Sequence, residues 1–251
     1  MKTKHLTICS IAAILFAASV QAAPVVFFGE NQSPGNKVSG APLAARNSFA
    51  GQLAGVGTET FTGFADGKAA PLALSFPGSG GGITGSLTGI GAVLQIAANT
   101  DSAGRYNTTG AGPATSTAGK VWVAQGSFSI AFNTAISAFG FYGTDIGDFN
   151  GQVTLTLRDT GGNDTLLTVA NTIDGNNASL LFWGFIDTTK AYTSITFGNT
   201  NAGTDFFGFD DMIVGDRGQI QPPNGVPEPG ILALLALGLV GARTVGRRRK
   251  A

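Results

Sequence analysis

Hydrophobic and polar residues alternate with a period of two through the middle of the chain. Many of the intervening positions are Ser or Thr in the four segments that show this alternation: 72–76, 127–132, 153–158 and 194–197. A period of two places alternate side chains on opposite faces of a strand, so each segment predicts a half-buried β-strand. Two longer apolar runs, at 136–142 and 179–186, predict central strands that are covered on both faces.

Turn-forming residues separate these segments at intervals typical of a β-sandwich, at 99–101, 159–164 and 174–177. A helix is predicted at 41–53, because Pro42 suits a first turn and Ala45, Phe49 and Leu53 recur at four-residue steps. The pattern therefore predicts an all-β protein, a jelly-roll-like β-sandwich of about ten strands with one short N-terminal helix.

The Gly-rich segment 78–89 is interpreted as a loop followed by an edge strand. Its Gly80, Gly82 and Gly85 have the spacing of a dinucleotide-binding fingerprint. No βαβ unit follows them, so we do not expect a nucleotide site here.

The N-terminus has the pattern of a secretory signal peptide. Lys2, Lys4 and His5 precede an apolar stretch at 6–20, and small residues follow it. We predict cleavage after Ala22, with Ala23 as the alternative, by signal peptidase after passage through the Sec translocon. The stretch is too short to predict a membrane span.

A second apolar run, at 231–242, lies near the C-terminus and precedes a basic tail that contains Arg247, Arg248, Arg249 and Lys250. If Arg243 extends its side chain to the membrane surface, the helix reaches residue 246, a length of roughly 24 Å. The positive-inside rule keeps the basic tail in the cytoplasm and the domain outside, in agreement with the N-terminal signal. The alternative is a packed C-terminal helix.

These boundaries divide the chain into four parts. Residues 1–22 are the signal peptide, and 23–218 form the extracytoplasmic β-sandwich domain. Residues 219–225 are a polar spacer. Residues 226–251 contain the transmembrane helix 231–246 and the basic tail.

Cleavage of the signal peptide removes the single His, His5, and the single Cys, Cys9. The mature chain therefore lacks the residues for Ser-His-Asp and Cys-His catalysis, for zinc or copper sites built on imidazole or thiolate, and for disulfides. Cations such as Ca²⁺ remain accessible, because they take oxygen ligands.

The charge of the chain is unevenly distributed. The formal net charge of the whole sequence is zero, but residues 24–225 contain eight basic and fourteen acidic residues, which leaves −6. Binding to nucleic acid requires a basic face, so we exclude nucleic acid as a partner of this domain.

The C-terminal segment resembles the PEP-CTERM sorting signal of Gram-negative bacteria. The resemblance rests on Val226, Pro227, Glu228 and Pro229, on the Leu/Ala/Gly helix and on the terminal Arg-Arg-Arg-Lys. It implies that exosortase, a cysteine protease of the inner membrane, recognises Pro-Glu-Pro and processes the tail. The signal is often found with exopolysaccharide production. The Pro-Glu-Pro residues would then be substrate residues of another enzyme.

The segments 58–64, 140–149 and 207–213 resemble a recurrent domain of PEP-CTERM proteins, over roughly residues 25–215. This resemblance implies a β-sandwich similar to carbohydrate-binding modules, in several of which an early acidic residue and one from the last strand share a structural Ca²⁺. Glu59, Asp210 and Asp211 are the corresponding candidates. The alternative is that the two aspartates are turn or edge residues that accept backbone N–H groups.

Asp145 and Asp148 form a second acidic pair, three residues apart among glycines. They could order a loop, bind a second cation or serve as the carboxylates of a glycoside hydrolase, which need a separation of roughly 5–9.5 Å. Tyr106 and Trp122 are the surface candidates for stacking on a sugar, whereas Trp183 lies in an apolar run and is expected in the core.

These features favour a non-enzymatic exported protein that works in the envelope or exopolysaccharide matrix. It would be anchored in the inner membrane before processing and then lie at the cell surface or outside. The alternatives are a calcium-dependent carbohydrate-binding module and, less well supported, a carboxylate-based glycoside hydrolase, because the domain has only Glu30 and Glu59 before the sorting signal.

Overall fold

The computed structural model describes residues 23–35, 37–96, 101–109, 119–201 and 205–221. The predicted signal peptide and sorting signal, including the predicted transmembrane helix 231–246, lie outside these ranges. Within the described ranges there is no helix that is both long enough and apolar enough to cross a membrane.

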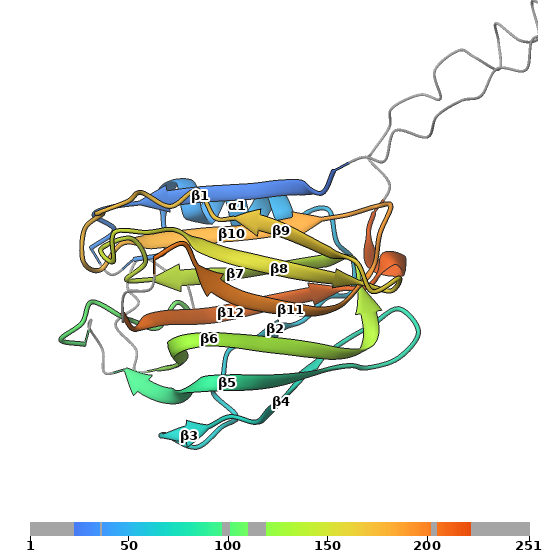
Figure 1. Cartoon of the computed structure of the whole chain (residues 1–251), viewed down its shortest axis with the longest axis horizontal. Helices are drawn as coiled ribbons and strands as arrows, with labels where there is room; N and C mark the ends of the chain where they lie inside the picture. Colours follow the sequence, from blue (N-terminus) through green and yellow to red (C-terminus); the bar gives the residue numbers. More distant parts are fainter. Residues whose placement is uncertain (1–22, 36, 97–100, 110–118, 202–204, 222–251) are drawn as a thin grey trace, which may run out of the picture.

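The described residues form twelve strands, one α-helix and one short 3-10 helix (Figure 1). The first half of the domain contains β1 (Val25–Asn31), α1 (Gly40–Ala50), β2 (Thr58–Glu59), β3 (Lys68–Ala69), β4 (Leu72–Phe76) and β5 (Ile83–Ile96). The second half contains β6 (Gly119–Ile136), β7 (Ala138–Thr144), β8 (Val153–Asp159), β9 (Asp164–Thr168), β10 (Leu180–Ile186), β11 (Tyr192–Asn199), β12 (Phe207–Gly215) and η1 (Arg217–Gln219).

The two longest strands, β5 and β6, each take part in two sheets. The first half of β6, up to Ala124, pairs with β12 and with the end of β5. The second half, from Phe128, pairs with β11 and with the start of β5. All twelve strands thus belong to one hydrogen-bonded sheet that folds into two layers at β5 and β6, and we call these layers the first and second sheets. The first has the order β1-β10-β7-β12-β6-β5-β3, with β2 also paired to β12, and the second has the order β4-β5-β6-β11-β8-β9.

Aromatic rings from the two sheets meet in a shared core. Phe197 of β11 contacts Phe139 and Phe141 of β7, with ring centroids 5.9 and 5.5 Å apart. Phe185 of β10 and Tyr192 of β11 meet at 5.4 Å. Because such rings bury large apolar areas, they hold the two sheets face to face. The predicted β-sandwich is confirmed.

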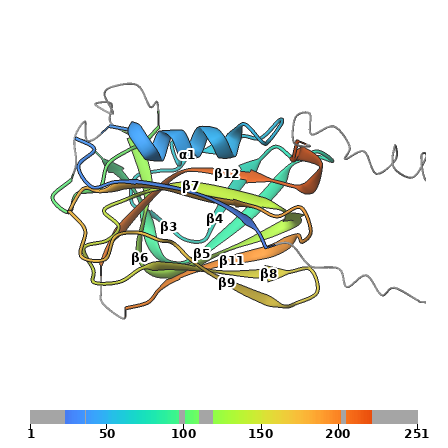
Figure 2. The same cartoon turned by 90° about the horizontal axis from the view of Figure 1, so that it is seen from above.

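Helix α1 covers the outer face of the first sheet, where it packs mainly against β1 and β10 (Figure 1 and Figure 2). Its Phe49 packs on Phe27 of β1 and Phe182 of β10, both at 5.6 Å between ring centroids. Every residue of β7 and of β10 is therefore buried, as the two continuous apolar runs predicted. Gly29 lets α1 approach β1, since a Cβ there would lie 2.2 Å from the Ala41 carbonyl oxygen.

The four alternating segments form strands whose apolar positions are buried, in β4, β6, β8 and β11. The predicted helix is confirmed and ends at Ala50, while Leu53 lies beyond it in a bridge to Ile220. The expected edge strand within residues 78–89 was wrong. Strand β5 pairs with β4 on one side and β6 on the other, so β4 is the outer strand there.

Candidate functional site

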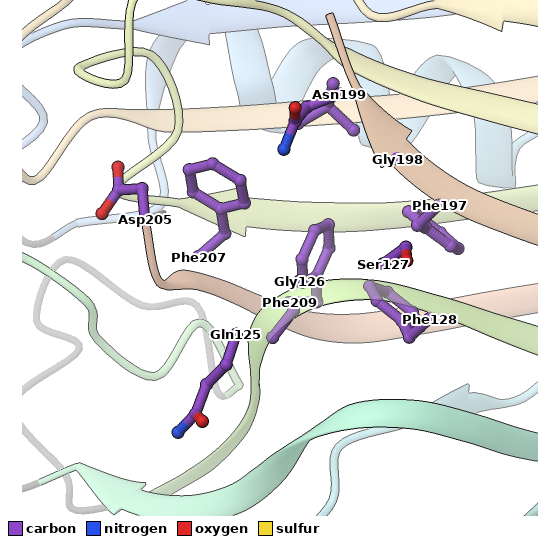
Figure 3. Close-up of a pocket in the computed structure, with 12 residues that line it drawn as sticks. Gln125, Gly126, Ser127, Phe128, Phe197, Gly198, Asn199, Asp205, Phe207 and Phe209 are labelled. Carbon is purple, nitrogen blue, oxygen red and sulfur yellow. The ribbon is translucent and has the colours of Figure 1, made fainter. Parts of the chain in front are cut away.

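A pocket of about 390 Å³ opens where β6 passes from the first sheet to the second. We call it the β6 pocket. It is lined by the switch segment Ala124–Phe128, by the end of β11 and by the start of β12, together with Val153 and Asp205 (Figure 3). The exposed residues 125–127 of β6 lie between its two pairing halves. The change of sheet therefore creates this pocket.

The β6 pocket combines an apolar floor with a polar rim. The floor contains Phe128 and Phe197, whose rings stack at 4.2 Å, and Phe209, which meets Phe128 edge-on at 5.1 Å. The rim carries the amides of Gln125 and Asn199, both exposed. A volume of this size falls within the range of small-molecule sites.

An acidic cluster, formed by Asp145, Asp148 and Asp205, adjoins this pocket through Asp205. Each contributes one carboxylate oxygen, and these oxygens all lie within 4.8 Å of one another. Within the described ranges this is the one set of three or more His, Cys, Asp or Glu residues close enough to share a cation. It contains both residues of the predicted second acidic site and adds Asp205.

Strand pairing brings these residues together from distant parts of the sequence. Strands β7 and β12 are antiparallel, with Thr144 opposite Gly208. The residues that follow β7 and those that precede β12 therefore meet at one end of the sheet. Asp145 has a φ of 62°, its N–H donates to the Ser179 carbonyl, and its Oδ1 accepts the Ala178 N–H at 3.3 Å.

Burial raises the pKa of both aspartates in the loop after β7. For Asp145, which is 2% exposed, burial is the largest cause and repulsion by Asp148 and Asp205 adds to it, so the pKa rises to about 7. For Asp148, burial and then the interaction with Asp205 raise the pKa to about 6. Arg105 lies near but binds Asp101 at 2.7 Å. The negative charge of the cluster is thus only partly balanced.

The acidic cluster could bind a metal ion. Its donor set consists of carboxylate oxygens, the ligands that hard cations such as Ca²⁺ prefer. The raised pKa values also fit a site whose negative charge Arg105 balances only in part.

The structure does not bring Glu59 together with Asp210 and Asp211 as a group within reach of one cation. The Glu59 carboxylate accepts the N–H of Phe61 at 2.7 Å. Asp210 is buried and accepts the N–H and hydroxyl of Thr108 at 2.8 and 3.0 Å. Burial and repulsion by Asp211 hold the pKa of Asp210 well above its ordinary range. Local donors hold these carboxylates in place of the expected shared cation.

The predicted surface aromatics are buried. Tyr106 is 1% exposed and Trp122 is 0% exposed, so neither presents a ring face to a sugar. Tyr106 packs in the outer cluster below α1, whereas Trp122 packs in the core between the sheets, 5.9 Å from Phe128. This expectation was wrong. Trp183 lies in the core as expected.

A protein-family model matches the C-terminal part of this chain. The PEP-CTERM protein-sorting motif matches residues 225–250, and this confirms the resemblance drawn from the Pro-Glu-Pro residues and basic tail. No curated protein matches the chain in sequence.

Two solved structures illustrate the structural likenesses. One is the C-terminal family 22 carbohydrate binding module of Clostridium thermocellum Xyn10B, with 14% identity, coverage of 66% of this chain and 97% of that chain, and a TM-score of 0.37. The other is the K2 cleaved adhesin domain of Lys-gingipain, with 14% identity, coverage of 63% and 97%, and a TM-score of 0.36. Likenesses at these TM-scores carry no argument about the site or its ligand.

Proposed function

We propose that this chain is a non-enzymatic exported protein that exosortase sorts and that works in the cell envelope or extracellular matrix, in association with exopolysaccharide. The observation that carries the proposal is the PEP-CTERM motif at residues 225–250. The signal-like N-terminus supports the same direction of export. Maturation of motif variants in a strain that makes exosortase tests it.

The proposed route has three steps. The Sec translocon exports residues 23–218 as a domain, and signal peptidase removes residues 1–22. Helix 231–246 then anchors the chain in the inner membrane with its basic tail in the cytoplasm. Exosortase processes the chain at the motif, and the domain reaches the surface or the medium.

A binding role suits the site better than hydrolysis. The residues after position 22 contain neither His nor Cys. The oxygens of the acidic cluster lie within 4.8 Å of one another. Carboxylates this close repel one another when ionised, and a proton or a cation shared among them relieves the repulsion.

We propose glycan binding in the β6 pocket as the second candidate function. The amides of Gln125 and Asn199, both exposed at the rim, support it, because an amide can donate to and accept from sugar hydroxyl groups.

Replacing Asn199 by Ala should weaken glycan binding in the β6 pocket by up to about tenfold, because it removes one hydrogen-bonding side chain from the rim. The measurement is a glycan array followed by titration of the best-bound oligosaccharide with the full-length chain. Asn163→Ala, in the turn between β8 and β9, is the matched control. Equal affinity for the Asn199 variant and wild type would contradict a glycan site in this pocket.

We propose Ca²⁺ as the cation of the acidic cluster. Calcium at about 100 times its Kd should raise the melting temperature by about 5–10 °C, since a ligand that binds only the native state stabilises it. The measurement compares calcium with a chelator in the full-length chain. Asp148→Asn should remove the shift, whereas Asp164→Asn, in an exposed ion pair, should retain it. Identical melting with calcium and with chelator would refute calcium binding.

A further inference from the structure

A second pocket, of about 420 Å³, lies on the outer face of the first sheet beside α1. We call it the α1 pocket. Arg46 and Asn47 come from α1, Tyr142 from β7, Asp211 from β12, and Thr109 from the segment before β6. It shares no lining residue with the β6 pocket.

The hydroxyl of Tyr142 is an unpartnered polar group at this pocket. Tyr142 is 2% exposed, and its oxygen has no hydrogen-bond partner in the part of the chain that the structure describes. The ring packs edge-on against Phe182 at 5.3 Å, which fixes its orientation. Burial raises the pKa of Tyr142, so the phenol keeps its proton. A buried hydroxyl without a partner is costly, and a bound ligand would supply the missing hydrogen bond.

Groups of opposite charge flank this hydroxyl. Both Arg46 and Asp211 act electrostatically on Tyr142. Within the described ranges Arg46 forms no salt bridge, and its one hydrogen bond goes to Asn47 Oδ1 at 3.4 Å. The guanidinium thus has donors to spare.

A bulge in β12 aims Asp211 at the pocket. The register shifts between Asp210 and Ile213, and Asp211 has a φ of 47°. The Thr109 hydroxyl donates to the Asp211 carboxylate at 3.0 Å, and the single Thr108 O–H is shared between Asp210 and Asp211, 3.0 Å from an oxygen of each. This fixes the carboxylate while leaving acceptor capacity on both oxygens.

We infer that the α1 pocket binds a neutral sugar residue. A donor-only guanidinium, a phenol and an acceptor-only carboxylate meet in one pocket, and adjacent sugar hydroxyls can accept from the first and donate to the last. An anionic ligand would meet the Asp211 carboxylate, and a cationic one would meet Arg46. The volume is sufficient for one pyranose ring.

The experiment titrates the full-length chain with D-glucose, D-galactose, D-mannose and D-xylose, and with two charged probes, glucuronate as the anion and L-alanine as a zwitterion. At least one neutral sugar should bind, and Tyr142→Phe should weaken it by about fivefold to tenfold, the effect of one lost hydrogen bond. Arg46→Gln should weaken it by about tenfold or more, because its hydrogen bonds are charge-assisted.

Tyr106→Phe is the matched control. Its hydroxyl is also buried and unpartnered, but Tyr106 does not line the pocket. Both Phe variants should melt at or above the wild-type temperature, so only loss of binding separates them. Binding of none of the neutral sugars, or of the charged probes alone, would overturn the inference. Equal binding of the sugar by Tyr142→Phe and Tyr106→Phe would also overturn it. Loss of binding in Asn199→Ala without loss in Tyr142→Phe would overturn it too, but would support glycan binding in the β6 pocket.

Discussion

Replacing both Pro227 and Glu228 by Ala should leave the C-terminal segment attached to the exported chain. The PEP-CTERM match covers these residues, and a protease that recognises Pro-Glu-Pro would lose both the fixed backbone angle of Pro227 and the negative charge of Glu228. We expect processing to fall from complete to undetectable. Intact mass measured on the membrane and extracellular fractions reports the result.

The control for this variant lies a few residues upstream. Pro222→Ala with Pro223→Ala makes a comparable change of composition in the spacer, before the residues that the motif matches. This chain should mature normally. Release of the Pro227/Glu228 variant with the wild-type mass would refute exosortase sorting, whatever the domain binds.

Local patterns predicted the β-sandwich because each strand's burial follows its own sequence. The alternation at 153–158 reappears as buried Val153, Leu155 and Leu157 in β8. The continuous run at 180–186 became a strand buried on both faces, since α1 covers the side away from the second sheet. Such patterns report how many faces of a strand are covered, and this is a local property.

The passage of β5 and β6 from one sheet to the other could not be predicted in the same way. Strands β5 and β6 read locally as ordinary strands, and only their successive partners show that each joins two sheets. The polar and glycine residues Gln125, Gly126 and Ser127, which follow the apolar run around Trp122 and are exposed, were the available sign that β6 is interrupted. The β6 pocket depends on this long-range pairing.

Two of the three residues of the acidic cluster were predicted, and the third was missed for a related reason. Asp145 and Asp148 were found because they are close in sequence, whereas Asp205 joins them through the pairing of β7 with β12. The sequence predicted a strand at 136–142 but not its pairing with β12, so nothing in it placed Asp205 beside the loop after β7. The residues around Tyr106 give no sign that it is buried, because its burial depends on how its segment packs against the outer face of the first sheet.

Asp145→Asn should change the pH dependence of stability. Its pKa is raised in the folded chain from 3.8 to about 7, so the native state binds more protons than the unfolded state between these values. Wild-type stability should therefore lose a contribution as pH rises from about 4 to about 7. The amide cannot ionise, and the variant should be more stable than wild type by about 1–2 kcal/mol at pH about 8, after allowance for solvent screening. Near pH 4 the two should be equal.

Thermal or denaturant unfolding of the full-length chain in chelator measures this difference, because a bound cation would offset the repulsion in the acidic cluster. Asp174→Asn is the matched control, since Asp174 is exposed and has a φ of 53°, close to the 62° of Asp145. Any gain from the preference of Asn for positive φ then appears in both variants at every pH. Only Asp145→Asn should show a gain in the free energy of unfolding that grows from pH about 4 to pH about 8, because only at position 145 does the substitution remove a buried charge. Parallel stability curves for Asp145→Asn and wild type would show that the Asp145 carboxyl ionises as readily in the folded chain as in the unfolded one.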